Sequence, residues 1–144
     1  MNKPKGFLTY PTDTTDDAAR AFATLQYIPT GVADNWPATD ADTANLLIDT
    51  VHKLRPAYRQ GAVWVMNSTT LSTIRKLKDV NGQFLWQNSL VEGQPGMLWG
   101  YPVIEAEDMP DIVADSLSVA FGNFDRGYTV VNSEAIKLIK LAAT

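Results

Sequence analysis

The stretch GAVWVMNSTTLSTIRKLKDVNGQFLW, residues 61–86, carries the densest set of structural signals in the chain. Its first part, Ala62–Met66, is a continuous apolar run with two valines and a tryptophan, which predicts a central strand covered on both faces. Asn67 or Ser68 can then accept the free N–H groups at the start of a helix. The stretch therefore predicts a buried strand that leads directly into a capped helix.

The second half of the stretch predicts how this helix packs and ends. Leu71, Ile74 and Leu77 recur at helical spacing, which indicates an apolar inner face. The Asn-Gly pair at 81–82 is a strong turn signal, because both residues tolerate positive φ. We expect Gln83–Trp86 to return as a short strand or ribbon.

A second capped helix is predicted upstream of the stretch. Thr39 and Asp42 form a Thr-x-x-Asp capping box ahead of an apolar series that includes Leu47 and Val51. Pro56 is expected to stop this helix, because proline cannot continue the hydrogen-bond ladder.

The N-terminal part gives weaker signals. We expect a short strand at Phe7–Tyr10, a short helix capped within Asp13–Asp17 and running to Ala21, and a strand at Ala23–Pro29.

The C-terminal part alternates strands and loops. Strands are predicted at Tyr101–Glu107, where Pro102 favours an edge or an early position, and at Leu117–Phe124. A turn at 125–127 leads to a strand at Tyr128–Val131. The pattern of Ser133–Ala142 fits a strand or a helix. Interleaved strands and helices around one core indicate an α/β or α+β class with a mixed sheet.

Composition excludes several function classes. The chain has 144 residues, 45% of them apolar and 19% charged, which suits one globular domain. The net charge of −4 argues against a specific nucleic-acid surface, because phosphate contacts need clustered Lys and Arg. The absence of cysteine excludes disulfides and thiolate catalysis, and it favours an intracellular origin. We find neither a signal peptide nor a membrane-spanning segment, so no membrane partner is expected.

Candidate catalytic and metal-binding residues have plainer explanations. His52, the only histidine, lies off the apolar face of its helix without a partner at helical spacing, so we expect it at the surface. Ser68 lacks a nucleophile elbow and suits a helix cap. An acidic run lacks the offsets of a calcium loop and is expected to be a solvated loop. The run contains Glu105, Glu107, Asp108 and Asp111.

No phosphate-binding glycine pattern occurs, and the four tryptophans are interpreted as core or contact residues. Trp64 belongs to the predicted central strand, whereas Trp36, Trp86 and Trp99 flank loops. The residues alone therefore indicate a structural or binding module with no catalytic site and no cofactor.

An ordered series of short motifs resembles the major capsid protein of tailed bacteriophages, the Hong Kong 97-type family. The series begins with a tryptophan strand ending in Met-Asn and a helix ending in Lys-Asp. An Asn-Gly turn, a Leu-x-Gly-x-Pro-Val segment and a Phe-Gly-x-Phe segment follow. These motifs are Trp64–Asn67, Lys78-Asp79, Asn81-Gly82, Leu98–Val103 and Phe121–Phe124.

The resemblance implies an α+β fold, with a mixed central sheet flanked by helices, like the axial domain of that family. It implies a non-enzymatic structural subunit of an icosahedral capsid, made in the bacterial host cytoplasm and located in the virion. The N-terminal arm, extended loop and spine helix have no counterpart in this sequence. Tyr128–Val131 joins Asn132–Lys137 directly, where the family inserts its peripheral strands. Residues 1–144 would then form a single axial-like domain.

The expected partners are copies of the chain itself around the centres of pentamers and hexamers. The isolated chain, lacking most shell contacts of the family, is expected to be monomeric or weakly associating. The loop nearest the capsomer axis is expected at Gln87, Asn88, Ser89, Leu90, Val91, Glu92, Gly93, Gln94, Pro95 and Gly96. In the family the chain returns to the axial sheet near its end, so Ser133–Ala142 is expected to be a strand. Two alternatives are an encapsulin-like shell protein of the same fold and a small unrelated α/β binding domain.

The acidic run gives the first testable prediction. Removing divalent ions with a chelator should leave the melting temperature unchanged, because Glu105–Asp111 lacks the ligand geometry of a calcium site. Thermal melting with and without chelator measures this, and a drop of many degrees would restore the metal interpretation.

Overall fold

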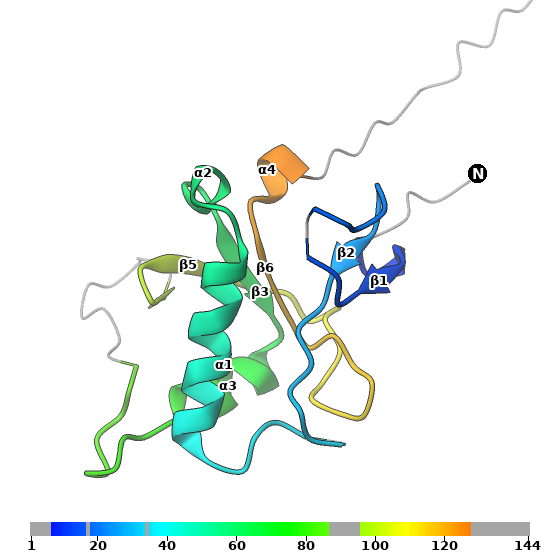
Figure 1. The fold of residues 1–144 in the computed structure, drawn as a ribbon. Coiled ribbons are helices and arrows are strands. Elements are labelled where there is room, and N and C mark those ends of the chain that lie inside the picture. The colour runs from blue at the N-terminus through cyan, green and yellow to red at the C-terminus, as the bar shows by residue number, and fades with distance from the viewer. Residues whose placement is uncertain (1–6, 17, 34, 87–95, 128–144) are drawn as a thin grey trace, which may run out of the picture.

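The structure, a computed structural model, describes residues 7–16, 18–33, 35–86 and 96–127. Within these residues a small mixed sheet is covered by helices, so the α+β prediction is confirmed (Figure 1). No helix among the described residues is long and apolar enough to cross a membrane. In chain order the elements are η1 (Phe7–Thr9), β1 (Thr12–Asp13), β2 (Leu25–Gln26), α1 (Asp40–Lys53), α2 (Pro56–Arg59), β3 (Val63–Met66), α3 (Ser68–Arg75), β4 (Met97–Leu98), β5 (Tyr101–Glu105), β6 (Val119–Gly122) and α4 (Phe124–Gly127).

The predicted central strand is β3, which pairs on both sides. The strand order is β4-β5-β3-β6, with β3 parallel to β5 and antiparallel to β6. Trp64 and Met66 are fully buried on one face of β3. Pro102 takes the early position predicted for it, because it lies opposite β4 and before Val103, the first residue of β5 in register with β3.

Helix α1 forms as its capping box predicts. The Thr39 Oγ1 accepts from the Asp42 N–H at 3.2 Å and donates to the Asp42 carboxylate at 2.5 Å. Leu47 and Val51 are buried in the core, and α1 lies across the sheet (Figure 1). Pro56 does more than stop α1, since it is the first residue of the short helix α2, where its missing N–H costs nothing.

Helix α3 begins at a buried asparagine. The Asn67 Oδ1 accepts from the Thr70 N–H at 2.8 Å, so Asn67, rather than Ser68, is the cap. Leu71 and Ile74 are buried as predicted, and Leu77 packs into the same core just beyond the end of the helix.

Aromatic residues join three strands of the sheet. The Trp64 Nε1–H donates to the Leu98 carbonyl at 3.1 Å, and the Trp64 and Phe121 ring centroids lie 4.5 Å apart. Phe121 in turn meets Tyr101 edge-to-face at 5.1 Å. The register is therefore fixed by side chains as well as by the backbone ladder.

The N-terminal predictions are corrected by the structure. Phe7–Tyr10 holds the single turn η1 instead of a strand, and the described residues between Asp13 and Ala21 hold the end of β1 and turns instead of a helix. The Asp13 carboxylate accepts from the Thr15 N–H and Oγ1, and such local bonds compete with a helix that has no apolar face to bury. Of Ala23–Pro29 only Leu25–Gln26 is a strand, paired in parallel with β1.

Among the described residues, some strands predicted after α3 are shorter in the structure or absent from it. Gln83–Trp86 is no strand and makes a single bridge, between Lys78 and Phe84. The strand predicted at Leu117–Phe124 is shorter, Val119–Gly122, and the turn after it is the one-turn helix α4. The strands expected at Tyr128–Val131 and Ser133–Ala142 lie outside the described residues.

The packing of α1 gives a test of its inner face. Leu47→Ala should lower the free energy of unfolding by roughly 2–5 kcal/mol, because Leu47 is 3% exposed and its loss leaves a cavity. His52→Ala, on the exposed face of the same helix, is the matched control and should change stability little. Chemical denaturation of both variants measures this, and equal losses would contradict the assigned face.

Candidate interaction surfaces

The predicted axis loop starts and ends at one place in the core. Gln87–Pro95 lie outside the described residues, and only Gly96 of the predicted set is described. A side chain on Gly96 would place its Cβ 3.2 Å from the Trp86 ring, so glycine permits this close approach. The Arg75 guanidinium lies 5.0 Å from the centroid of the Trp86 ring, a cation–π distance. The two ends of the loop therefore meet beside the C-terminal end of α3.

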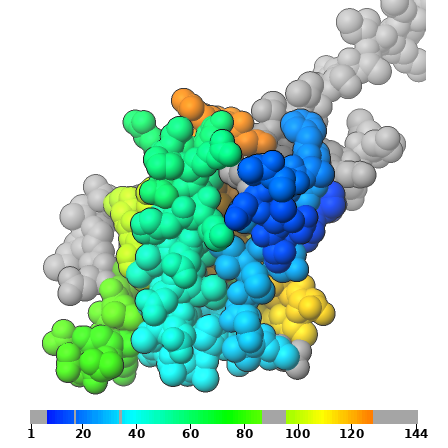
Figure 2. Space-filling view, viewed as in Figure 1, coloured from blue at the N-terminus to red at the C-terminus, as the bar shows by residue number. Residues whose placement is uncertain are grey.

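An exposed tip lies between α3 and this loop. The Asp79 carboxylate accepts from the N–H groups of Asn81 and Gln83, both at 2.9 Å, and Gly82 adopts φ +79°. The predicted turn is thus present. Val80 at the tip is 97% exposed, and the segment forms the bright green lobe of Figure 2.

A preformed pocket lies between α1 and the β4–β5 turn. Its volume is about 270 Å³, and its lining is mixed aromatic, aliphatic and cationic. The lining residues are Ile48, Val51, His52, Arg59, Trp99 and Tyr101. His52 is exposed, as predicted, but its role as a pocket wall has no signal in the sequence.

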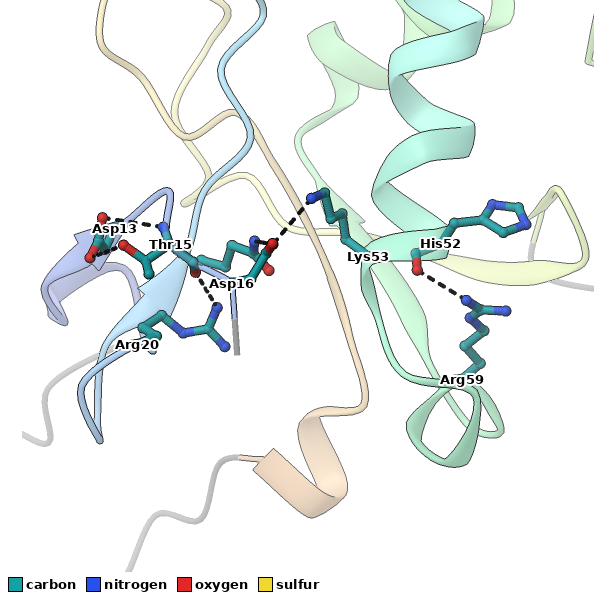
Figure 3. A network of polar contacts seen from close by, with 8 residues as sticks. Asp13, Thr15, Asp16, Arg20, His52, Lys53 and Arg59 are labelled. Carbon is teal, nitrogen blue, oxygen red and sulfur yellow. Dashed lines mark hydrogen bonds and ion pairs between the residues drawn. The ribbon is translucent and has the colours of Figure 1, made fainter. Parts of the chain in front are cut away.

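The Arg59 side chain is held rigidly in this pocket. Its Nε donates to the Leu54 carbonyl at 2.8 Å, and its Nη2 donates to the His52 carbonyl at 3.0 Å (Figure 3). Both carbonyls belong to the end of α1, where a cation is favoured by the helix dipole. The guanidinium is therefore pre-oriented before any partner arrives.

Trp99 adopts a strained backbone conformation at the mouth of the pocket. Trp99 and Gly100 have φ of +48° and +83° between the paired residues Leu98 and Tyr101. Positive φ at both central residues defines a type I′ turn, which favours Asn-Gly. A bulky residue in this region costs on the order of 1–3 kcal/mol. The cost falls on a side chain that stays 38% exposed.

The acidic run serves the start of α3. The Ser68 hydroxyl donates to the Glu107 carboxylate, with Glu105 at 3.5 Å, and the Asn67 Nδ2 donates to the Asp111 carboxylate at 2.7 Å. Negative groups suit the N-terminal end of a helix. Within the described residues no group of three or more possible ligands gathers as a metal site.

The N-terminal segment is tied to α1 by an ion pair. The Lys53 Nζ lies 3.2 Å from the Asp16 carboxylate, and this bond lowers the pKa of Asp16 (Figure 3). Hydrogen bonds from Thr15 likewise lower the pKa of Asp13. Both carboxylates are exposed, so their bonds fix the position of the N-terminal segment but contribute little to the free energy of unfolding. A second hollow, of about 350 Å³, lies where this segment meets α2.

The four tryptophans divide as predicted in part. Trp64 is core, and Trp86 is buried at the base of the loop, while Trp36 packs against the core from its edge. Trp99 is 38% exposed. A Trp-Gly pair between two strand signals could have indicated the strained turn, but only the pairing of Leu98 with Tyr101 reveals it.

Comparison with known proteins identifies the family. Residues 1–143 match the phage capsid family. The comparison with curated proteins finds no match.

Two solved structures are similar to this chain, the capsids of the empty and of the native gene transfer agent (GTA) particle, both computed with C5 symmetry. Each is 44% identical, with a TM-score of 0.72 and coverage of 85% of this chain. The match covers 40% and 44% of those capsid chains, so this chain spans about two-fifths of their length. Because the family match extends over nearly the whole sequence, as the ordered motifs predicted, the chain belongs to the phage capsid family.

Proposed function

We propose that this chain is a structural subunit of a phage-type icosahedral capsid, or the axial-domain part of one. The family match over residues 1–143 carries the proposal, and the likeness to gene transfer agent capsids supports it. Capsid families are structural, so the chain is proposed to be no enzyme and to need no cofactor. Its place is the capsid of a virion or virus-like particle, after synthesis in the bacterial cytoplasm.

The partners of the chain in this role are copies of itself. Capsomers are closed rings, so each copy meets its neighbours through two different faces. Residues 1–144 would form a single axial-like domain without the peripheral excursion at 128–137. The loop Gln87–Gly96 would lie nearest the ring axis. The meeting of Trp86 and Gly96 supports this placement, because it makes the loop a closed excursion from the core.

Particle fractionation tests the proposed function. Particles from cells that encode this chain would be treated with nuclease and separated on a density gradient, and peptides from residues 40–127 would be quantified by mass spectrometry. The peptides should peak with nuclease-protected DNA, because a capsid subunit shields the packaged genome. A cytosolic enzyme measured in the same fractions is the control. Peptides confined to the slow fractions with that enzyme would refute the proposal.

The oligomeric state of the isolated chain gives a separate prediction. The chain should sediment as a monomer at micromolar concentration, because a single axial contact buries little area. Sedimentation velocity over a concentration series measures this. A stable pentamer or hexamer at low micromolar concentration would contradict the monomer and strengthen the capsid assignment. A tight two-fold dimer would count against both.

A further inference from the structure

Charges of opposite sign are segregated along the chain. Residues 50–78 carry six cationic side chains and no acidic residue, whereas residues 79–125 carry eight acidic residues and neither Lys nor Arg. In the fold, the cationic end of α1 and the acidic segment after β5 occupy different parts of the molecule. The α1–α2 junction lies at the upper end of the view and the yellow segment lies at its lower right (Figures 1 and 2). The surface at the α1–α2 junction, with Lys53, Arg55 and Arg59, is called the cationic face here, and the surface of the segment after β5, with Glu107, Asp108 and Asp115, is called the acidic face.

The acidic face carries a rigid apolar knob. Ser116 closes the turn, because its hydroxyl donates to the Asp111 carbonyl at 2.7 Å and accepts from the Val113 N–H at 3.1 Å. The Ser116 N–H also donates to the Val113 carbonyl at 3.2 Å. Val113 is 58% exposed, with Asp111 and Asp115 on either side in the sequence. An exposed aliphatic side chain two residues before Asp115 is thus held in a closed turn, whereas the Asp111 carboxylate is bonded to Asn67.

The cationic face carries a pocket of matching chemistry. At about 270 Å³ it is smaller than the roughly 300–1,000 Å³ of typical ligand pockets, so its size suits one inserted side chain better than a cofactor. Trp99 and Tyr101 supply apolar walls, and the fixed Arg59 supplies a positive charge at the edge. Arg and Trp are the residues most often found at the centre of protein interfaces.

We propose that Val113 of one copy inserts into the pocket lined by Trp99, Tyr101 and Arg59 of the next copy, with Asp115 facing Arg59. This inference rests on the proposed function and names the partner surface within it. Because the turn that holds Val113 and the pocket share no residue, the contact is head-to-tail, and it forms a ring when the rotation between copies closes. A charge-assisted bond to a pre-oriented guanidinium would fix the angle between copies.

Backbone strain marks both halves of the contact. The described non-glycine residues with positive φ are Ala23, Trp99 and Asp115, and the last two belong to the pocket and to the knob. Strained residues persist where the surrounding structure enforces them and gather at functional sites. Aspartate tolerates this conformation better than tryptophan, so Trp99 is the more strained of the two residues.

Crosslinking between single-cysteine variants tests the contact even where association is weak. The native chain has no cysteine, so every disulfide formed is the engineered one. His52→Cys and Val113→Cys proteins would be mixed at high concentration and oxidised. We expect the mixture to give at least about ten times more disulfide heterodimer than the control pair, His52→Cys with Val80→Cys. Val80 is a matched exposed valine on another part of the surface.

The double variant His52→Cys with Val113→Cys tests ring closure. Oxidation should give a ladder of covalent oligomers that ends at a closed pentamer or hexamer. Equal yields from the test and control pairs, or homodimers of either single variant as the main product, would overturn the proposal.

Replacement of Trp99 separates contact from stability. In the His52→Cys chain, Trp99→Asn should raise the melting temperature, because Asn-Gly suits a type I′ turn. The same change should lower the yield of disulfide heterodimer with the Val113→Cys chain about tenfold. A cysteine-free chain with both Trp99→Asn and Val113→Ser, added to the mixture as a competitor, should compete about tenfold less well than the unmodified chain. Unchanged yield with Trp99→Asn, or equal competition by this double variant, would refute the contact.

The crosslinking and fractionation experiments can fail independently of each other. If the chain fractionates with protected DNA but the cysteine pair fails, this contact alone is wrong. If the cysteine pair forms but the chain is absent from particles, the self-contact stands and the capsid role fails.

Discussion

The buried side chain of Asn67 holds three parts of the molecule together. Its Oδ1 accepts from the Thr70 N–H, and its Nδ2 donates to the Met109 carbonyl and the Asp111 carboxylate. One amide thereby starts α3 at the end of β3 and fixes the segment that follows β5. An unpaired buried amide costs about 1–3 kcal/mol, so these partners must all be in place together. The position of the acidic face depends on this one residue.

Aromatic contacts within the sheet hold the wall of the pocket in place. Trp64 on β3 bonds the Leu98 carbonyl, at the end of β4, and packs on Phe121, which packs on Tyr101. Tyr101 follows the strained Trp99-Gly100 turn and lines the pocket. The core thus fixes the pocket wall, and the end of α1 fixes its arginine. Such rigidity suits the proposed contact between copies, because small errors in the angle between copies accumulate around a ring.

The successes and failures of sequence reasoning follow a physical division. The predictions for α1, β3 and α3 held because each element combines a cap or a long apolar run with a face that the core buries. The predictions near the N-terminus failed because that segment has no such face. Its outcome was decided by the Thr15 bonds to Asp13 and by the ion pair between Asp16 and Lys53. The second of these joins residues far apart in sequence.

The sequence by itself determined the family, the α+β class, the central strand and its capped helix, since these depend on local pattern and on motifs in a fixed order. It also determined the turn at Asn81-Gly82 and the exposure of His52. Tertiary structure alone decided that His52, Arg59 and Trp99 share one pocket, and that Val113 is 58% exposed in a turn closed by Ser116. Residues of α1, α2 and the β4–β5 turn meet in this pocket through strand pairing and helix packing. Their spacing in the chain does not encode the short distances between them.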